Sequence, residues 1–128
     1  ILFMMCFVGM PTIFYGDELG VQGMQEEEYR APMPWKGGDL ALLGFFRKAI
    51  AMRHALSPLR KGSFQILSAE GGSRVIRFRR YTGTECVTVS INAGKTDAAV
   101  SSSEETLYWA EGFQNGVLSP GGFAVTFR

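Results

Sequence analysis

The chain has 128 residues, of which 46% are hydrophobic and 20% are charged, and this is the composition of a folded globular protein. Its formal net charge of +1 leaves no electrostatic footprint for nucleic acid or for an anionic membrane, so we expect neither as a partner. The two cysteines, Cys6 and Cys86, lie far apart in apolar stretches, which favours buried, reduced thiols over a disulfide framework or a zinc site.

The first 15 residues are almost entirely apolar. They are too few to span a bilayer, which takes roughly 20 residues, and they lack the basic start and the small-residue cleavage site of a signal peptide. We therefore expect them to be buried core, and the absence of a visible export signal favours a cytoplasmic location. Because the chain opens at Ile1 in the middle of a hydrophobic pattern, we expect it to be a fragment of a longer protein.

Glycine and proline divide this apolar start into elements. Gly9 followed by Pro11 is typical of a helix C-terminus, which predicts that a helix ends just before them. The β-branched and aromatic residues 12–15 then predict a short buried strand, which Gly16 ends. The irregular segment 16–38 follows, and loops of that length inside compact proteins are usually functional or disordered.

The clearest predicted helix covers residues 39–55. Asp39 is suited to cap its N-terminus. The residues that recur at helical spacing after it are Leu42, Leu43, Phe46, Ala49, Ile50 and Arg53. Cations gather near its C-terminus, where His54 is expected to act as a capping residue, and Pro58 is expected to prevent continuation.

From Gly62 onward the apolar residues recur with a period of two, which predicts strands. The residues expected to face the core are Phe64, Ile76, Phe78, Val87, Val89, Ile91, Val125 and Phe127. Their polar neighbours, such as Thr88, are expected to face solvent. The glycine-bearing turns expected to separate the strands include "AEGGS" and "SPGG". The pattern predicts an antiparallel β-sandwich or open barrel over residues 61–128, after a partial α/β unit over residues 1–57.

One sequence motif carries a family resemblance. The pattern G-x-P-x-x-x-Y-G-x-E is met here by Gly9, Pro11, Tyr15, Gly16 and Glu18. A long loop containing "RAPMPW", an amphipathic helix ending in "RKAIAMRHALSPLRKGSF", and a terminal β domain follow in order. Together these features resemble the C-terminal part of an alpha-amylase family glycoside hydrolase, on the cyclomaltodextrinase, neopullulanase and oligoglucosidase side of that family. In these enzymes the motif marks the eighth strand of the barrel.

The resemblance implies a fold class that is mainly β: a C-terminal antiparallel β-sandwich preceded by the last strand and helix of a (β/α)8 barrel. Residues 12–15 would be that strand, residues 39–55 that helix, and the loop between them would lie at the active-site face of the barrel.

The resemblance also implies what the parent enzyme does. Such enzymes cleave α-glucosidic bonds with retention, using two carboxylates about 5 Å apart, so the parent's partner would be an alpha-glucan or maltooligosaccharide. In the family the catalytic acids lie on strands that would precede Ile1. We therefore expect no catalytic residue in this chain, no cofactor, no metal site, and no activity of the chain alone.

Asp17 and Glu18 directly follow the predicted strand. Adjacent residues in an extended segment point to opposite sides, so this pair cannot easily share one substrate atom. We expect Glu18 to accept hydrogen bonds that hold the loop, and Asp17 is a candidate for direct contact with a sugar.

Arg30 and Trp35 are the other candidate substrate-binding residues. A guanidinium can form paired hydrogen bonds to vicinal hydroxyls or hold a carboxylate, and an indole can stack on the apolar face of a sugar. Members of the family carry an arginine in this loop near the non-reducing-end subsites, followed by a Pro-Met-x-Trp element that Pro32, Met33 and Trp35 match. Two roles stay open for Arg30, namely substrate contact and a structural salt bridge.

Other charged and aromatic groups have simpler interpretations. The acidic run 26–28 lacks the alternating spacing of a calcium-binding loop, which favours a solvated stretch. The basic strand residues that we expect to keep a sheet edge soluble are Arg77, Arg79 and Arg80. The aromatic residues that we expect in the core, with a starch-binding platform as the alternative, are Tyr108, Trp109 and Phe113.

Three functional hypotheses follow from the sequence. The first is a truncated glycoside hydrolase; the second is a carbohydrate-binding module that holds a glucan without cleaving it; the third is a purely structural β domain. Because the neighbouring strands of a barrel are missing from the chain, the apolar faces of residues 1–15 would lack cover, and we also expect self-association of the fragment.

Overall fold

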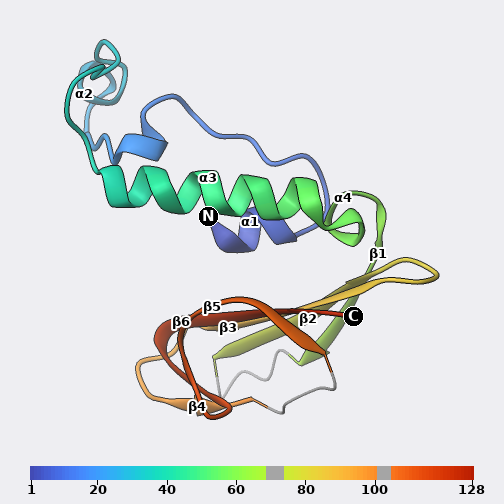
Figure 1. The fold of residues 1–128 in the computed structure, drawn as a ribbon. Helices are drawn as coiled ribbons and strands as arrows, with labels where there is room; N and C mark the ends of the chain where they lie inside the picture. Colours follow the sequence, from blue (N-terminus) through green and yellow to red (C-terminus); the bar gives the residue numbers. More distant parts are fainter. Residues whose placement is uncertain (69–73, 101–104) are drawn as a thin grey trace.

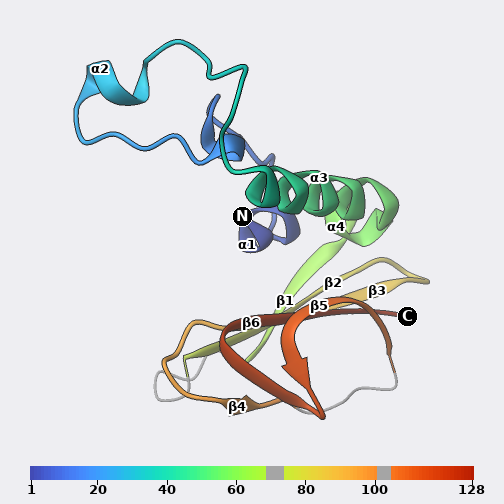
Figure 2. The ribbon, with the colours of Figure 1, turned by 60° about the vertical axis from the view of Figure 1, so that its left-hand side comes forward.

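The computed structural model describes residues 1–68, 74–100 and 105–128 (Figure 1). A layer of helices lies over one face of an antiparallel sheet, and a loop projects from the helix layer away from the sheet (Figures 1 and 2). The helical segments are α1 (Leu2–Cys6), the 3-10 helix η1 (Asp17–Leu19), α2 (Glu26–Tyr29), α3 (Leu40–Ala55) and α4 (Ser57–Lys61). The strands are β1 (Ser63–Ser68), β2 (Val75–Tyr81), β3 (Cys86–Asn92), β4 (Ala98–Ala99), β5 (Thr106–Gln114) and β6 (Val117–Phe127). The predicted "AEGGS" turn lies outside the described residues.

The long helix α3 confirms the helix predicted over residues 39–55. The Asp39 carboxylate accepts a hydrogen bond from the Leu42 backbone N–H at 2.9 Å, which caps the N-terminus. The chain then forms a second helix, α4, with Pro58 in its first turn, where the missing N–H of proline costs no hydrogen bond. In the part of the chain that the structure describes, no helix has the length and apolar character needed to cross a membrane.

The helix predicted at the start of the chain is present as α1, but the strand predicted over residues 12–15 is not formed. Among the described residues none pairs with this segment, and a strand needs a neighbour for its backbone hydrogen bonds. The buried core expected over residues 1–15 is formed in part, by Leu2, Met5 and Cys6. The exposed apolar residues of the same stretch are Ile1, Phe3, Val8, Met10, Phe14 and Tyr15. Self-association through these side chains stays a prediction.

The described strands form one six-stranded antiparallel sheet, which confirms the mainly β fold class. Its order is β1-β2-β3-β6-β4, and β5 pairs with β6. The long strand β6 pairs with β3 through residues 123–127 and with β4 through residues 117–118. The strands predicted for a sandwich are thus joined through β6 into a single curled sheet (Figure 2).

The core lies between the helix layer and the sheet face that meets it. Its buried residues include Cys6, Ala49, Met52, Leu59, Phe78, Val87, Val89, Trp109, Phe123 and Val125. The Phe78 ring is surrounded by the rings of Phe3, Phe7 and Phe64, with centroid separations of 5.7, 6.0 and 5.5 Å. This aromatic cluster joins α1 to β1 and β2.

The predicted inward-facing set is confirmed except at one position. Phe78, Val87, Val89 and Val125 are at most 1% exposed, and the predicted residues that pack partly buried against the core are Phe64, Ile91 and Phe127. Ile76 is 37% exposed. It shares a face with Phe78 but lies two residues beyond the contacts that α1 makes there, at the rim of the covered area.

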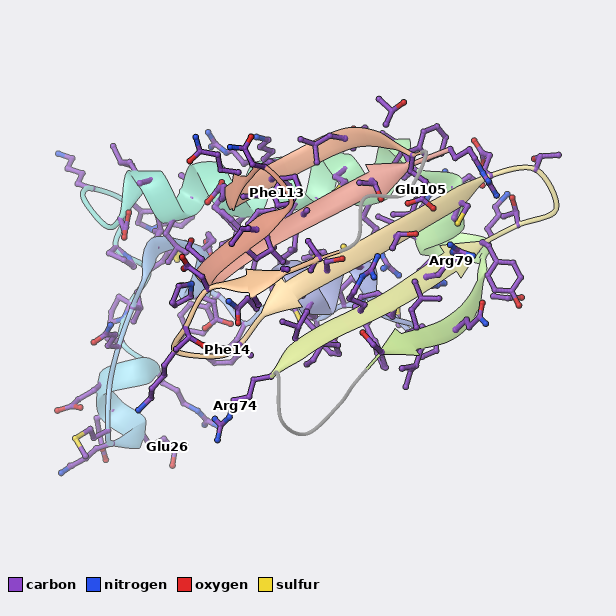
Figure 3. All side chains as sticks on the ribbon, turned by 90° about the horizontal axis from the view of Figure 1, so that it is seen from below. Phe14, Glu26, Arg74, Arg79, Glu105 and Phe113 are labelled. Atoms are coloured by element: carbon purple, nitrogen blue, oxygen red, sulfur yellow. The ribbon has the colours of Figure 1, made fainter. Side chains whose placement is uncertain are left out.

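The prediction that the polar residues of β3 face solvent is wrong, because this strand is buried on both faces. Thr88 is 3% exposed, and its hydroxyl donates to Oε1 of Glu105 at 2.9 Å. The Thr126 hydroxyl donates to the other carboxylate oxygen, and the Arg79 guanidinium lies 3.6 Å from the same carboxylate (Figure 3). The Glu105 side chain is 3% exposed, so these partners compensate a buried charge.

The prediction that Arg80 keeps a sheet edge soluble is wrong, because this side chain is buried. It is 3% exposed, and it lies on the same face of β2 as Phe78 because alternate residues of a strand share a face. The backbone carbonyls that accept hydrogen bonds from its guanidinium, at 2.8 to 3.2 Å, are those of Cys6, Phe7, Leu59 and Gly62. One side chain of the sheet therefore holds the end of α1 and the C-terminal part of α4.

Arg53 of α3 completes this arrangement from the helix layer. It donates to the carbonyls of Met5 at 2.7 Å, Phe7 at 3.3 Å and Gly9 at 2.7 Å. The last carbonyls of a helix have no partner within the helix, and the two arginines supply partners for those at the end of α1. Burial and the nearby charge of Arg53 lower the pKa of Arg80, but a guanidinium stays protonated in proteins.

The first prediction concerns the Arg80 hydrogen bonds. We expect Arg80→Met to lower the free energy of unfolding by about 3 kcal/mol or more, because four carbonyls lose a charged donor. Arg60→Met, at an exposed position of α4, is the matched control and should change it by less than about 0.5 kcal/mol. Urea unfolding followed by circular dichroism measures both. Similar effects of the two substitutions would contradict this role of Arg80.

The second prediction concerns the Cys6 thiol. Cys6 is 0% exposed, and burial raises its pKa to about 12, so the reactive thiolate is scarce at pH 8. We expect iodoacetamide to alkylate it slowly in the folded chain and rapidly in urea, as measured by peptide mass spectrometry. Rapid alkylation of the folded chain would contradict the structure.

The same shift gives a dependence of stability on pH. The folded chain keeps a proton that the unfolded thiol loses near its ordinary pKa of 9.0. The stabilisation linked to this group is therefore complete below that pH and declines as the pH rises toward 12. Cys6→Ala should remove this part of the decline, and an unchanged profile would count against it.

Candidate functional site

The segment in which the sequence predicts substrate-binding residues, 16–38, forms a loop that projects from the helix layer. Its base, η1, lies beside the start of α3, and α2 lies at its tip (Figures 1 and 2). Gly16 has a φ of +90°, and a Cβ at this position would lie 2.9 Å from a methyl carbon of Val21. The turn that opens the loop therefore requires glycine.

Both carboxylates after this glycine bind backbone groups of the loop base. Asp17 accepts a hydrogen bond from the Phe14 N–H at 3.2 Å, and Glu18 accepts one from the Gly16 N–H at 3.0 Å. The Leu19 carbonyl accepts a hydrogen bond from the backbone N–H of residue 39 at 3.0 Å, which ties the loop base to α3. The holding role expected of Glu18 is seen here, and sugar contact by Asp17 stays a prediction.

Arg30 lies directly after α2, and its guanidinium is 2.6 Å from the Glu26 carboxylate. Both side chains are more than half exposed, so this is a solvent-screened surface pair. The Glu28 carboxylate accepts hydrogen bonds from the backbone N–H groups of Met24 at 2.7 Å and Gln25 at 3.4 Å, within a capping box. The salt bridge predicted as one role of Arg30 is formed, and substrate contact by Arg30 stays a prediction.

The acidic run of α2 has no metal-binding arrangement. Glu26 pairs with the arginine after the helix, and Glu28 caps the helix. Over the described ranges no group of three or more His, Cys, Asp or Glu side chains is placed to hold a metal ion.

Trp35 carries a large, accessible ring on the returning segment of the loop. Trp35 is 87% exposed, and its backbone N–H donates to the Met33 carbonyl at 2.9 Å in a tight turn. The Tyr15 hydroxyl donates to the Ala31 carbonyl at 3.3 Å, which ties this returning half of the loop to its outgoing half. An exposed indole on a braced turn can stack on the apolar face of a sugar ring.

The three predicted substrate-binding residues are spread along the loop. Asp17 lies at its base in η1, Arg30 lies after α2 at its tip, and Trp35 lies on the returning segment (Figures 1 and 2). Figure 3 shows Glu26, the partner of Arg30, well away from the sheet. Among the described residues of this chain, Asp17, Arg30 and Trp35 therefore belong to different parts of the loop.

The alternative of a starch-binding platform on β5 is not built as the sequence suggested. Trp109 is 4% exposed, its ring lies 4.9 Å from those of Phe45 and Phe123, and Lys48 Nζ lies 4.5 Å from its centroid. Tyr108 is 46% exposed, and Phe113 is half-buried. Trp109 belongs to the core as expected, whereas the same prediction is wrong for Tyr108, and the three rings do not form one binding surface.

Sequence reasoning missed the two arginines that position the start of this loop. Arg53 and Arg80 hold the carbonyls at the end of α1, directly before the segment that leads to Gly16. The sequence could have revealed Arg80, because alternate residues of a strand share a face, and Ile76 and Phe78 on the same face were predicted to point inward. For Arg53 the signal was its helical spacing, which continues the apolar face of α3 and places it on the side that meets α1.

No family model matches the chain. In sequence, the chain is 35% identical over 97 residues to a cyclomaltodextrinase from a Bacillus species and 33% identical over 94 residues to neopullulanase 2 from Thermoactinomyces vulgaris. These matches cover 74% and 72% of this chain. The chain spans 17% and 16% of the length of these two relatives.

Solved enzyme structures also share this fold. The maltogenic amylase from S. marinus matches with a TM-score of 0.83 at 25% identity, and a debranching enzyme from Nostoc punctiforme matches with a TM-score of 0.81 at 26% identity. Each match covers 98% of this chain, but 18% and 27% of the two enzymes. By sequence and by fold, the chain corresponds to a minor part of an alpha-amylase family glycoside hydrolase, which confirms the resemblance carried by its motif.

Proposed function

We propose that the chain is the C-terminal portion of a glycoside hydrolase that cleaves α-glucosidic bonds of an alpha-glucan or maltooligosaccharide with retention. In this proposal residues 1–57 complete a catalytic (β/α)8 barrel and residues 61–128 form the C-terminal β domain. The observation that carries it is the braced loop 16–38, with its exposed indole and guanidinium, in a chain related to a cyclomaltodextrinase and a neopullulanase. The enzyme would act in the cytoplasm.

The catalytic carboxylates would be supplied by the part of the enzyme before Ile1. Retaining hydrolysis needs two carboxyl groups about 5 Å apart on opposite sides of the scissile bond. The candidates in the loop are engaged otherwise, because Asp17 and Glu18 bind backbone N–H groups and Glu28 caps a helix. The exposed apolar side chains around α1 also favour this view, since a preceding barrel segment would cover them.

The loop would contribute to substrate binding and not to bond cleavage. Arg30 would donate hydrogen bonds to sugar hydroxyls, Trp35 would stack on a sugar ring, and Asp17 would contact the sugar from the loop base. The two glycines with positive φ at the base, Gly16 and Gly20, and the Tyr15 bond to Ala31 would hold the loop in shape.

The third prediction tests the proposed function directly. The 128-residue chain should not hydrolyse maltoheptaose, cyclodextrin or pullulan, whereas the same chain expressed with the open reading frame upstream of Ile1 should do so with retention of the anomeric configuration. Chromatography of the products and NMR of the fresh anomer measure this. Turnover that co-purifies with the short chain, or inversion by the long one, would overturn the proposal.

The fourth prediction separates the two roles of Arg30. Arg30→Ala and Glu26→Ala both remove an exposed salt bridge and should each change the free energy of unfolding by less than about 0.5 kcal/mol. If Arg30 contacts substrate, only Arg30→Ala should raise KM in the long chain, by roughly tenfold for a lost charged hydrogen bond. Equal kinetic effects of both substitutions would assign Arg30 to the salt bridge alone.

A further inference from the structure

The β domain contains a hollow of about 760 Å³ that the proposed function does not use. It lies at the tip of the β5–β6 hairpin, and its side-chain lining includes Asp97, Phe113, Gln114, Asn115 and Ser119. Its volume falls in the range of small-molecule binding sites. The hairpin tip and the loop that carries α2 lie at opposite ends of the molecule, with the helix layer between them (Figures 1 and 2).

The hairpin turn gives the hollow a rigid wall. Asn115 and Gly116 have φ values of +49° and +78°, as a two-residue turn with left-handed residues requires, and the strands on either side pair at once, Gln114 with Val117. The Gly116 carbonyl accepts a hydrogen bond from the Val100 N–H at 2.8 Å. The amide side chains of Gln114 and Asn115 are therefore carried by a braced turn.

A bulge opposite the turn shapes the other wall. The pairing of β5 with β6 is interrupted between Glu111 and Phe113, where residues 119–122 loop out of β6. A Cβ on Gly112 would lie 2.4 Å from the Ser119 hydroxyl oxygen, and a Cβ on Gly122 would lie 2.6 Å from the Gly112 carbonyl oxygen. Glycine is therefore required on both strands, and bulges of this kind redirect side chains next to binding sites.

The chemistry of the lining selects the class of ligand. A half-buried aromatic ring (Phe113), two carboxamides, a carboxylate (Asp97) and a hydroxyl (Ser119) face one space. The hydroxyl of Ser119 donates to the Gly112 carbonyl at 3.1 Å, which leaves its lone pairs as acceptors. Among the described residues that line this hollow none is a lysine or an arginine, whereas Asp97 supplies a carboxylate, which disfavours an anionic ligand. An uncharged molecule with many hydroxyls and an apolar ring face satisfies all of these groups.

We propose that this hollow is a second carbohydrate-binding site, which holds a neutral α-linked oligosaccharide on the Phe113 ring remote from the loop 16–38. The choice of an α-glucan as the ligand rests on the proposed function, whereas the site itself rests on the hollow. Figure 3 shows Phe113 and Glu105 at different places along the sheet, so the site is also distinct from the buried polar cluster around Glu105. Such a site would hold a long substrate against the β domain.

The experiment is calorimetric titration of the 128-residue chain with maltoheptaose, with cellohexaose as the control for linkage. We expect maltoheptaose to bind and Phe113→Ala to weaken its binding at least tenfold, which corresponds to about 1.4 kcal/mol. Gln114→Ala, an exposed change that cannot disturb the core, should weaken binding about threefold to tenfold. Tyr108→Ala, an exposed ring on the same strand outside the hollow, is the matched control and should leave binding unchanged.

Two outcomes would overturn this site. One is the absence of heat at about 10 mM maltoheptaose, far above the concentration that a specific site needs. The other is loss of binding in Trp35→Ala with full binding in Phe113→Ala, which would move the sugar to the loop. In the long chain Phe113→Ala should leave hydrolysis of maltotriose unchanged. Failure of this site and failure of the proposed hydrolase are therefore measured separately.

Discussion

The buried guanidinium of Arg80 joins three parts of the chain that are far apart in sequence. It reaches from β2 to the carbonyls of Cys6 and Phe7 at the end of α1, and to those of Leu59 and Gly62 around α4. A short helix such as α1 has too few internal hydrogen bonds to be stable by itself, and its exposed carbonyl end would be costly to bury. The arginine removes that cost, and it does so from the β domain. The helix layer and the sheet are therefore held together by a polar contact at the centre of an apolar interface.

Arg53 holds the backbone carbonyls on the side of α1 that leads to the candidate site. Its hydrogen bonds to Met5 and Gly9 fix the direction in which the chain leaves α1. The segment after Gly9 carries no strand hydrogen bonds within the described residues, so its path depends on such anchors and on the turn at Gly16. The loop base is then tied to α3 through Leu19 and the capped start of that helix. The position of the exposed Trp35 and Arg30 is therefore set by contacts that begin in the β domain.

The sequence was sufficient wherever one local rule decided the structure. Asp39 followed by a helical apolar period predicted α3 to within a residue, and alternation predicted the inward side of β2, β3 and β6. It was insufficient where a partner elsewhere decided. Residues 12–15 have strand composition, yet no described strand pairs with them, and Thr88 alternates as a surface residue yet lies under Glu105. Arg80 lies on the same face of β2 as the core residue Phe78, but its charge favoured a position in solvent. It is buried because it supplies hydrogen bonds to the carbonyls at the end of α1.

The candidate site followed the same division. The motif around Gly16 predicted where the loop begins. The structure explains this glycine, because a Cβ at position 16 would collide with the Val21 side chain. The sequence did not reveal that Asp17 lies in η1 at the base of the loop and Arg30 directly after α2 at its tip, since this depends on how α2 projects. The "SPGG" stretch, by contrast, reads as an ordinary turn in the sequence.

Its place in the structure gives that stretch another meaning. Residues 119–122 leave β6 as a bulge, and Gly122 meets the Gly112 carbonyl so closely that neither strand tolerates a side chain there. An ordinary hairpin would have continued its pairing and closed the space beside Phe113. The backbone gives up ladder hydrogen bonds at this point. Ser119 and the Asn115–Gly116 turn brace it on both sides, and it keeps a polar hollow open at the tip of the β5–β6 hairpin.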